Sequence, residues 1–145
     1  MYKKVAFLSM DSLENFYTYD KLLFEALKTL AWSAEEISWR HETVPWSDFD
    51  AVVVRSTWDY QNDLSKFKNV LEKINSVSHL ENDIELMKWN MNKNYLFDLE
   101  QKGVRIVDTI WEKNFNSSKA HHYFDKLNTD EIIIKPNVSA SADNT

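Results

Sequence analysis

The sequence contains no cysteine and a single glycine among its 145 residues. Without cysteine there can be no disulfide, no thiolate metal site and no cysteine nucleophile. A Walker loop or a dinucleotide-binding fingerprint needs several glycines where the backbone approaches phosphate, so the lone Gly103 excludes both. If this chain binds a nucleotide, lysine side chains must make many of the contacts.

Basic residues are too few for a general nucleic-acid or membrane-surface binder. The chain has 17 Lys and Arg against 23 Asp and Glu, a net charge of -6 and a pI near 5.2. Nucleic acids and anionic membranes both select a basic face. The apolar runs are strand-sized and the start lacks a signal-peptide core. We therefore expect a cytoplasmic protein with a small-molecule substrate and with no nucleic-acid or membrane partner, and we leave a homodimer open.

The first part of the chain alternates between strand and helix patterns. Short apolar runs at Lys3–Ser9, Glu35–Trp39 and Asp50–Ser56 predict strands, the last one apolar enough to be covered on both faces. Apolar residues at helical spacing predict a helix over Thr18–Leu30 and another over residues 67–74. This order predicts an α/β fold with a doubly wound parallel sheet.

The pattern breaks around residues 76–82, which divides the chain into a first domain at residues 1–82 and a second at residues 83–145. Helices are predicted at Ile84–Trp89 and Asn92–Gln101, and Gly103 should end the second of them.

The rest of the second domain predicts two strands around a helix. The strands are Val104–Val107 and Glu131–Lys135, and the helix is Ser117–Leu127. After Pro136 the chain continues in small polar residues with no further strand. Because a sheet begun by two strands would keep unpaired edges, we expect the natural protein to continue and this chain to be a fragment.

Polar residues follow the first and third predicted strands. In open α/β sheets, ligands bind beyond the carboxyl ends of the strands, and an arginine there can grip a carboxylate through two parallel hydrogen bonds. We assign substrate binding to Asp11, Arg55, Thr57 and Asp59. The alternative is a purely structural Arg55–Asp59 ion pair, with Trp58 packed in the core.

Two lysines form the second candidate site. Lys135 follows Ile132–Ile134 directly, where its charge is costly near the hydrophobic interior unless an anion meets it. A polyphosphate is such an anion, so we assign cofactor binding to Lys93 and Lys135, with Ser139 and Ser141 in a loop of small side chains that phosphate can approach. The alternative is a lysine at a strand end that extends its ammonium group into water.

The remaining histidines and tryptophans give weaker signals. His121 and His122 are adjacent on a predicted helix, so they point to different faces and cannot chelate one metal ion. Given the acidic balance, we expect the tryptophans to be packing residues rather than platforms that stack on bases. They are Trp32, Trp39, Trp46, Trp89 and Trp111.

Three motifs in the second part, taken in order, resemble ATP-grasp proteins. They are Asn90-Met-Asn-Lys-Asn-Tyr-Leu96, then Leu99–Thr109, then Ile-Ile-Lys-Pro at 133–136. The resemblance is strongest to the bacterial group related to the ligase-like enzyme of cycloserine synthesis, and more distant to the ribosomal-protein glutamate ligases. Val5–Leu13 and Arg55–Tyr60 also resemble the N-terminal domain of that group. The resemblance covers the whole chain, but only about the first half of a family-length protein.

The resemblance implies a fold and an activity. Residues 1–82 would form the pre-ATP-grasp, substrate-side domain, and residues 83–145 the start of the α+β ATP-grasp nucleotide-binding domain. The whole protein would be an ATP-dependent carboxylate-amine or carboxylate-thiol ligase that acts through an acyl phosphate on a small amino-acid-like or peptide substrate. We expect the 145-residue chain alone to be inactive.

The resemblance also implies cofactors. In the family, two lysines reach the nucleotide phosphates, and the matching positions here are Lys93 and Lys135. ATP and Mg²⁺ are the expected cofactors, with the metal ligands beyond Thr145. The family's loop after the lysine strand is usually rich in glycine, whereas this chain has small residues at Ser139–Ala142.

A different class of function fits the first domain less well. A non-catalytic α/β small-molecule-binding domain, or a receiver-type regulatory domain, would use Asp11 and the end of the third strand as an acidic pocket. A receiver needs several acids at the first strand, and this sequence offers only Asp11 there.

Overall fold

The computed structural model describes residues 2–140 and divides into two compact units, Met1–Met91 and Asn92–Thr145. The predicted domain boundary at residue 82 falls before helix α3 (Ile84–Asn90), whereas the division between the units falls after Met91. Met91 is buried in the core of the first unit, so α3 is anchored there.

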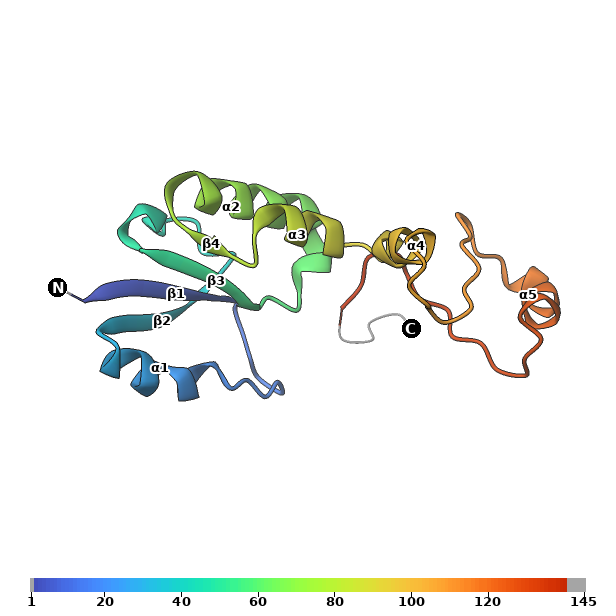
Figure 1. Ribbon diagram of the computed structural model, residues 1–145, viewed down its shortest axis with the longest axis horizontal. Helices are drawn as coiled ribbons and strands as arrows, with labels where there is room; N and C mark the ends of the chain where they lie inside the picture. Colours follow the sequence, from blue (N-terminus) through green and yellow to red (C-terminus); the bar gives the residue numbers. More distant parts are fainter. Residues whose placement is uncertain (1, 141–145) are drawn as a thin grey trace. The chain divides into compact units, whose positions relative to one another are not determined.

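The first unit is built on a parallel sheet of four strands in the order β2-β1-β3-β4. Helix α1 (Asp20–Thr29) covers one face, and α2 (Leu64–Val77) and α3 cover the other (Figure 1). This confirms the predicted α/β fold with parallel strands. The strands are β1 (Lys3–Ser9), β2 (Trp32–Ser38), β3 (Ala51–Ser56) and β4 (Leu80–Glu81).

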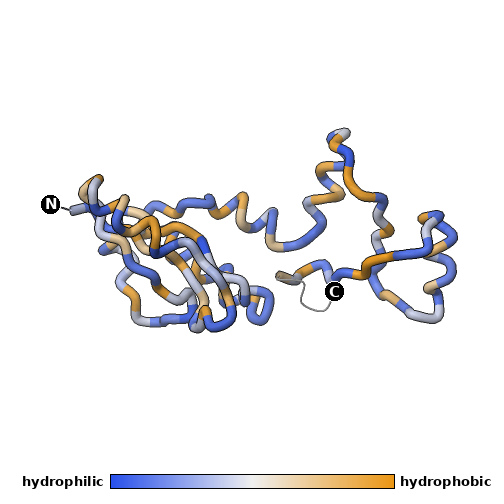
Figure 2. Tube along the Cα trace, turned by 90° about the horizontal axis from the view of Figure 1, so that it is seen from below, coloured by the Kyte–Doolittle hydropathy of each residue, from blue (hydrophilic) through white to orange (hydrophobic). Residues whose placement is uncertain are grey.

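Strand β1 is central because its side chains enter a hydrophobic core on each face of the sheet. Val5 and Phe7 pack in the cluster that includes α1, while Ala6 and Leu8 pack in the cluster that includes α2. Successive side chains of a strand point to opposite faces, so a continuous apolar run fits a strand covered on both sides. Figure 2 shows hydrophobic stretches along the strands of this unit.

Two features of the sequence explain helix α2: the helical spacing of its apolar residues and a side chain that caps its N-terminus. Phe67, Leu71 and Ile74 recur on one face and are fully buried, each contributing about 1.5–3 kcal/mol from burial. The Asp63 side chain caps the helix by accepting a hydrogen bond from the backbone N–H of Lys66 at 3.0 Å.

The tryptophans named as packing residues differ in how deeply they are buried. Trp39 and Trp46 are 0% and 3% exposed and lie in the larger core cluster. Trp32 is partly buried against the smaller cluster. Trp89 and Trp111 are 39% and 40% exposed, and the Trp111 ring packs edge-on against Phe97, with ring centroids 6.2 Å apart.

Strand β4 was not predicted, because it is only two residues long and lies where the sequence pattern breaks. Its place is set by long-range contacts: Val52 pairs with Leu80, and the N–H of Val52 donates to the carbonyl of His79 at 2.8 Å. Leu80 is buried in the core.

The second unit contains α4 (Asn94–Gln101), a short 3₁₀ helix over Ser117–Lys119 and α5 (Ala120–Leu127). The predicted strands at 104–107 and 131–135 are wrong for this chain, since neither segment is assigned as a strand. A strand needs a partner for its backbone hydrogen bonds, and none lies beside these segments in the described part of the unit. Ile133 and Ile134 are 73% and 44% exposed, so the expected buried setting of Lys135 is also wrong.

Gly103 ends α4, as predicted. Its φ of 80° is left-handed, a conformation that glycine adopts without strain. The N–H of Gly103 donates to the carbonyl of Glu100 at 2.9 Å, and that of Val104 donates to Leu99 at 3.0 Å, which is the Schellman pattern. Among residues 2–140, no helix has the length and apolar content needed to cross a membrane.

Candidate functional site

The four residues assigned to substrate binding lie at the carboxyl edge of the sheet, but the structure does not join them into one cluster. Asp11 lies in the segment after β1, Arg55 is in β3, and Thr57 and Asp59 follow β3. Each carboxylate or guanidinium group among them has a different partner, and the predicted alternative, an Arg55–Asp59 pair, is not formed.

Arg55 binds a carboxylate of this chain. Its Nε and Nη2 lie 2.8 Å and 2.7 Å from Oδ1 of Asp20, and the Ser56 hydroxyl donates to Oδ2 of the same residue at 2.8 Å. Asp20 is 1% exposed and is the first residue of α1, where the helix dipole also favours a negative charge. The side chain of Arg55 is 42% exposed. This network ties the start of α1 to the end of β3.

Asp59 binds two residues that directly follow β2, Trp39 and Arg40. Its Oδ1 accepts from the indole Nε1 of Trp39 at 2.7 Å, and its Oδ2 accepts from Nε of Arg40 at 2.8 Å. The guanidinium carbon of Arg40 lies 4.0 Å from the centroid of the Trp39 ring, a cation–π contact. Since Trp39 is fully buried, Asp59 connects the core to the surface.

Asp11 and Thr57 differ in access to solvent. Asp11 is exposed, and its Oδ1 accepts a short hydrogen bond of 2.5 Å from the Ser38 hydroxyl. Thr57 is only 5% exposed, and its carbonyl accepts from the N–H of Tyr60 at 3.1 Å. Thr57 is therefore a buried turn residue, whereas Asp11 can meet a ligand.

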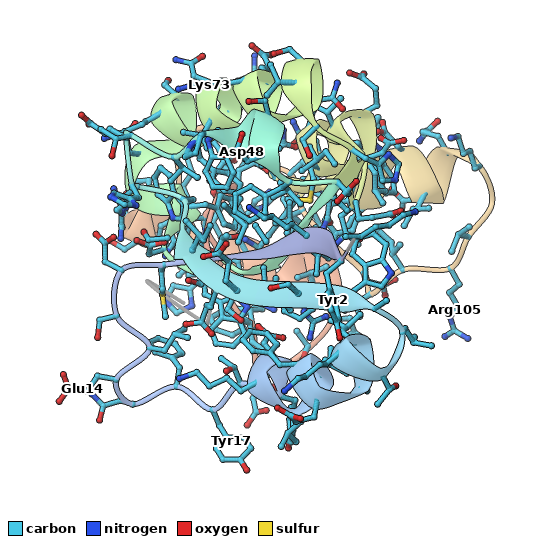
Figure 3. The ribbon with its side chains drawn as sticks, turned by 90° about the vertical axis from the view of Figure 1, so that its left-hand side faces the viewer. Tyr2, Glu14, Tyr17, Asp48, Lys73 and Arg105 are labelled. Atoms are coloured by element: carbon cyan, nitrogen blue, oxygen red, sulfur yellow. The ribbon has the colours of Figure 1, made fainter. Side chains whose placement is uncertain are left out.

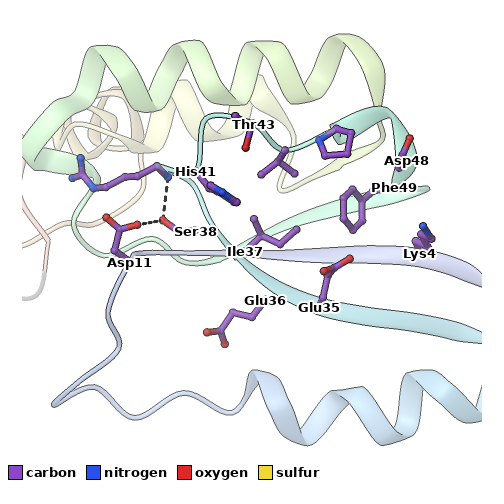
Figure 4. Close-up of a pocket in the computed structure, with 13 residues that line it drawn as sticks. Lys4, Asp11, Glu35, Glu36, Ile37, Ser38, His41, Thr43, Asp48 and Phe49 are labelled. Carbon is purple, nitrogen blue, oxygen red and sulfur yellow. Dashed lines mark hydrogen bonds between the residues drawn. The ribbon is translucent and has the colours of Figure 1, made fainter.

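An open groove of about 690 Å³ runs along β2 (Figure 4). Asp11 and Ser38 lie at one end of it and Lys4 at the other, while Glu35 and Glu36 point to opposite faces of the strand. Its lining includes both charged and apolar side chains. Among the residues that line it are Asp11, Ser38, Arg40, Ile37, Val44 and Phe49.

The segment between β1 and α1 borders the same edge of the sheet. Glu14 and Tyr17 point away from the sheet (Figure 3). Phe16 packs against Trp58, with ring centroids 5.4 Å apart. Trp58 is thus held between this segment and the core cluster, and is half-buried rather than fully enclosed.

In the second unit, Lys93 immediately precedes α4 and is tied to the segment after Pro136. Its Nζ donates to the Ser139 hydroxyl at 2.7 Å, and its backbone N–H donates to the carbonyl of Asn137 at 2.8 Å. Lys93 and Ser139 are therefore together, as the predicted site requires. Ser141 lies outside the described residues.

Lys135 is exposed but electrostatically close to Lys93. Partial burial is the main cause that lowers the pKa of Lys93 below the ordinary lysine value, and the positive charge of Lys135 lowers it further. In residues 2–140, neither lysine forms an ion pair with an acid. The two cations thus share a site without a counter-charge from the described chain.

No metal centre forms in the part of the chain that the structure describes, where no three His, Asp or Glu side chains gather at one point. Within residues 2–140, Asp11 belongs to no such group of acids.

Sequence reasoning missed two residues of this edge, Asp20 and Arg40. Asp20 resembles an ordinary acid in the first turn of a helix, and only its pairing with Arg55 across 35 positions shows its role. Arg40 directly follows the buried Trp39, and this adjacency was the one sequence signal that could have pointed to a role for Arg40 at this edge. Its partner Asp59 is 19 positions away.

The comparisons with known proteins agree with one another. A family model described as the N-terminal domain of D-cycloserine synthetase DcsG matches residues 5–82. The cycloserine biosynthesis protein DcsG of Streptomyces lavendulae is 37% identical over 87 residues, which is 60% of this chain and 29% of that protein. A crystal structure of D-cycloserine synthetase DcsG superposes with a TM-score of 0.81 and 27% identity, over 97% of this chain and 48% of that one.

The chain thus spans less than half the length of either relative. The family match covers β1 through β4, including Asp11, Arg40 and Arg55, while the structural match extends into the second unit. On these grounds the chain belongs to the family of the DcsG N-terminal domain.

Proposed function

We propose that this chain is the N-terminal part of an ATP-dependent ligase, which activates a carboxylate as an acyl phosphate and joins it to an amine. Family membership and the structural likeness to a synthetase along nearly the whole chain support this. Under the proposal, the first unit is a doubly wound substrate-side domain, and the second is the beginning of an ATP-grasp nucleotide-binding domain.

The observation that carries the proposal is the position of Lys93, whose ammonium group is held by the Ser139 hydroxyl and is close enough to Lys135 for its pKa to be lowered by that second charge. Two like charges near each other raise the free energy of both, and partial burial of Lys93 adds to the cost. A polyphosphate removes this cost because it supplies several negative oxygens to both ammonium groups. The hydrogen bond to Ser139 fixes the Lys93 side chain in advance.

These residues could bind the phosphates of ATP, but they provide no ligands for Mg²⁺. Hard cations such as magnesium require carboxylate or other oxygen ligands, and the described residues offer no suitable group of acids. When bound, ATP would supply the phosphoryl group, and the metal would offset its charge. The role of this chain would be to bind and orient phosphate through Lys93 and Lys135.

The test is a titration of the ¹³C,¹⁵N-lysine-labelled chain with ATP and with tripolyphosphate, followed by NMR. Saturable shifts of the Lys93 and Lys135 side chains are expected. Lys93→Met and Lys135→Met should each weaken binding by about tenfold, because each removes one charge-assisted contact. Lys102→Met removes an exposed cation from the end of α4 and serves as the matched control. Equal affinities for all three variants would refute the proposal.

A further inference from the structure

The side chain of Lys93 is held in place by a neutral group rather than by an acid. Its Nζ lies 2.7 Å from the Ser139 hydroxyl, and its backbone N–H donates to the carbonyl of Asn137 at 2.8 Å. Within residues 2–140, no carboxylate forms an ion pair with Lys93. The amine therefore has a defined position, and no negative charge of the described chain stabilises its protonated form.

The surroundings of Lys93 also favour the uncharged amine. Partial burial is the main cause that lowers its pKa, and the positive charge of Lys135 lowers it further. A lysine with an ordinary pKa is almost entirely protonated at neutral pH, so it has no lone pair with which to attack a carbonyl carbon. A larger share of Lys93 is present as the free amine, which makes it the better nucleophile at that pH.

The neighbouring cation adds a second property. Lys135 is exposed and, among the described residues, has no acid paired with it, so it can attract an anion from solution. An acyl phosphate suits both lysines, because its phosphate is negatively charged and its carbonyl carbon is open to attack by an amine. With its phosphate near Lys135, such a reagent would bring its carbonyl group close to Lys93.

We propose that Lys93 is a modification site, where a small acyl phosphate from solution acylates the side-chain amine without the help of another enzyme. The amine lone pair attacks the carbonyl carbon and forms the new N–C bond. The C–O bond to phosphate breaks, inorganic phosphate leaves with that electron pair, and one amine proton passes to water. Because the amide product carries no charge, acylation would weaken phosphate binding at this site, a consequence that rests on the proposed function.

The test is incubation of the chain with acetyl phosphate in the absence of nucleotide. Unreacted amines are then capped with deuterated acetic anhydride, and peptide mass spectrometry gives the acetylated fraction at each lysine. Lys88 is the internal reference, because its Nζ lies 3.1 Å from Glu72 and that hydrogen bond raises its pKa. Lys93 should react at least about fivefold faster than Lys88, since more of it is free amine. In the urea-unfolded chain the two rates should be nearly equal.

Two variants separate the attraction of phosphate from the reactivity of the amine. Lys135→Met should slow acetylation of Lys93 by acetyl phosphate about fivefold or more. It should slow acetylation by the uncharged reagent N-succinimidyl acetate less, because that reagent has no phosphate for Lys135 to attract. Lys102→Met removes an exposed cation at the end of α4 and should leave both rates unchanged.

Two results would overturn the proposal. One is a rate at Lys93 no higher than at Lys88 in the folded chain, or an equal preference for Lys93 in the unfolded chain. The other is an unchanged rate with acetyl phosphate in Lys135→Met.

The outcome is distinguishable from that of the phosphate-binding test. Acetylation is measured without nucleotide, whereas the titration with tripolyphosphate uses the unmodified chain, so either can fail while the other succeeds. If both succeed, the chain acetylated at Lys93 should bind tripolyphosphate about tenfold more weakly, as Lys93→Met does, because one charge-assisted contact is lost.

Discussion

Replacing Asp59 by alanine should destabilise the first unit strongly, although Asp59 is a polar residue on a turn. The change leaves the indole N–H of Trp39 without its acceptor in a fully buried position, which costs about 1–3 kcal/mol. It also breaks the ion pair with Arg40, whose side chains are 25% and 23% exposed, for about a further 1 kcal/mol. The sum is about 2–4 kcal/mol, which corresponds to a fall in melting temperature of about 10 °C or more for a unit of this size.

The assay is urea unfolding followed through the backbone amide signals of β1, which belongs to the first unit and keeps its signals in every variant. Glu42→Ala is the matched control, because it also breaks a carboxylate–cation pair, but one whose acid is 77% exposed. That control should cost much less than Asp59→Ala, because an ion pair with a fully exposed acid contributes little to stability. The double variant Trp39→Phe with Asp59→Ala should cost less than the sum of the single changes, since the indole donor and its acceptor are then removed together.

The reasoning is refuted if Asp59→Ala is no more destabilising than Glu42→Ala, or if the two changes in the double variant are additive. In either case Asp59 would not anchor Trp39 and Arg40, and the groove would lose the basis for a positioned guanidinium group.

Three further changes test other parts of the chain. Arg55→Met should lower the free energy of unfolding more than Asp20→Asn in the same urea assay. Arg55→Met leaves the buried Asp20 carboxylate without a cation, whereas in Asp20→Asn the freed Arg55 side chain can reach water. The reverse order of the two variants would contradict the structure. Gly103→Ala should destabilise the end of α4 by about 1 kcal/mol through its positive φ alone, since an added Cβ meets nothing within 4 Å. Hydrogen exchange of the α4 amides would show this, and Gly103→Asn should be milder. The affinity for tripolyphosphate should fall as pH rises through the lowered pKa of Lys93, because only the protonated amine attracts phosphate. The fall should begin at a lower pH than for an ordinary lysine. An affinity that does not change with pH across that range would contradict this prediction.

Local sequence patterns were sufficient to predict those helices and strands whose apolar spacing already matches the faces that they bury. The run Lys3–Ser9 predicted β1 at its observed bounds, and the spacing of Phe67, Leu71 and Ile74 predicted α2. Prediction failed for the segments 104–107 and 131–135, because an apolar run becomes a strand only beside a partner strand. Strand propensity at Ile132–Ile134 could not reveal that this partner is missing from the described unit.

The candidate site was predictable as a place, but not as a set of contacts. The rule that ligands bind at the carboxyl ends of parallel strands pointed to Asp11, Arg55 and Asp59. The same rule could not tell which acid each arginine meets. The observed pairs, Arg55 with Asp20 and Arg40 with Asp59, depend on how the segments beyond the strands fold back across the sheet.

The position of β1 between two cores makes its length intolerant of change. Deleting one residue before Phe7 would turn every later side chain of the strand to the opposite side. Phe7 would then compete for the space shaped around Ala6 beneath α2, while Ala6 or Leu8 would have to fill the place of an aromatic ring that meets Phe24 edge-on at 5.5 Å. Homologues should therefore vary in the loops on either side of this strand, and not in its number of residues.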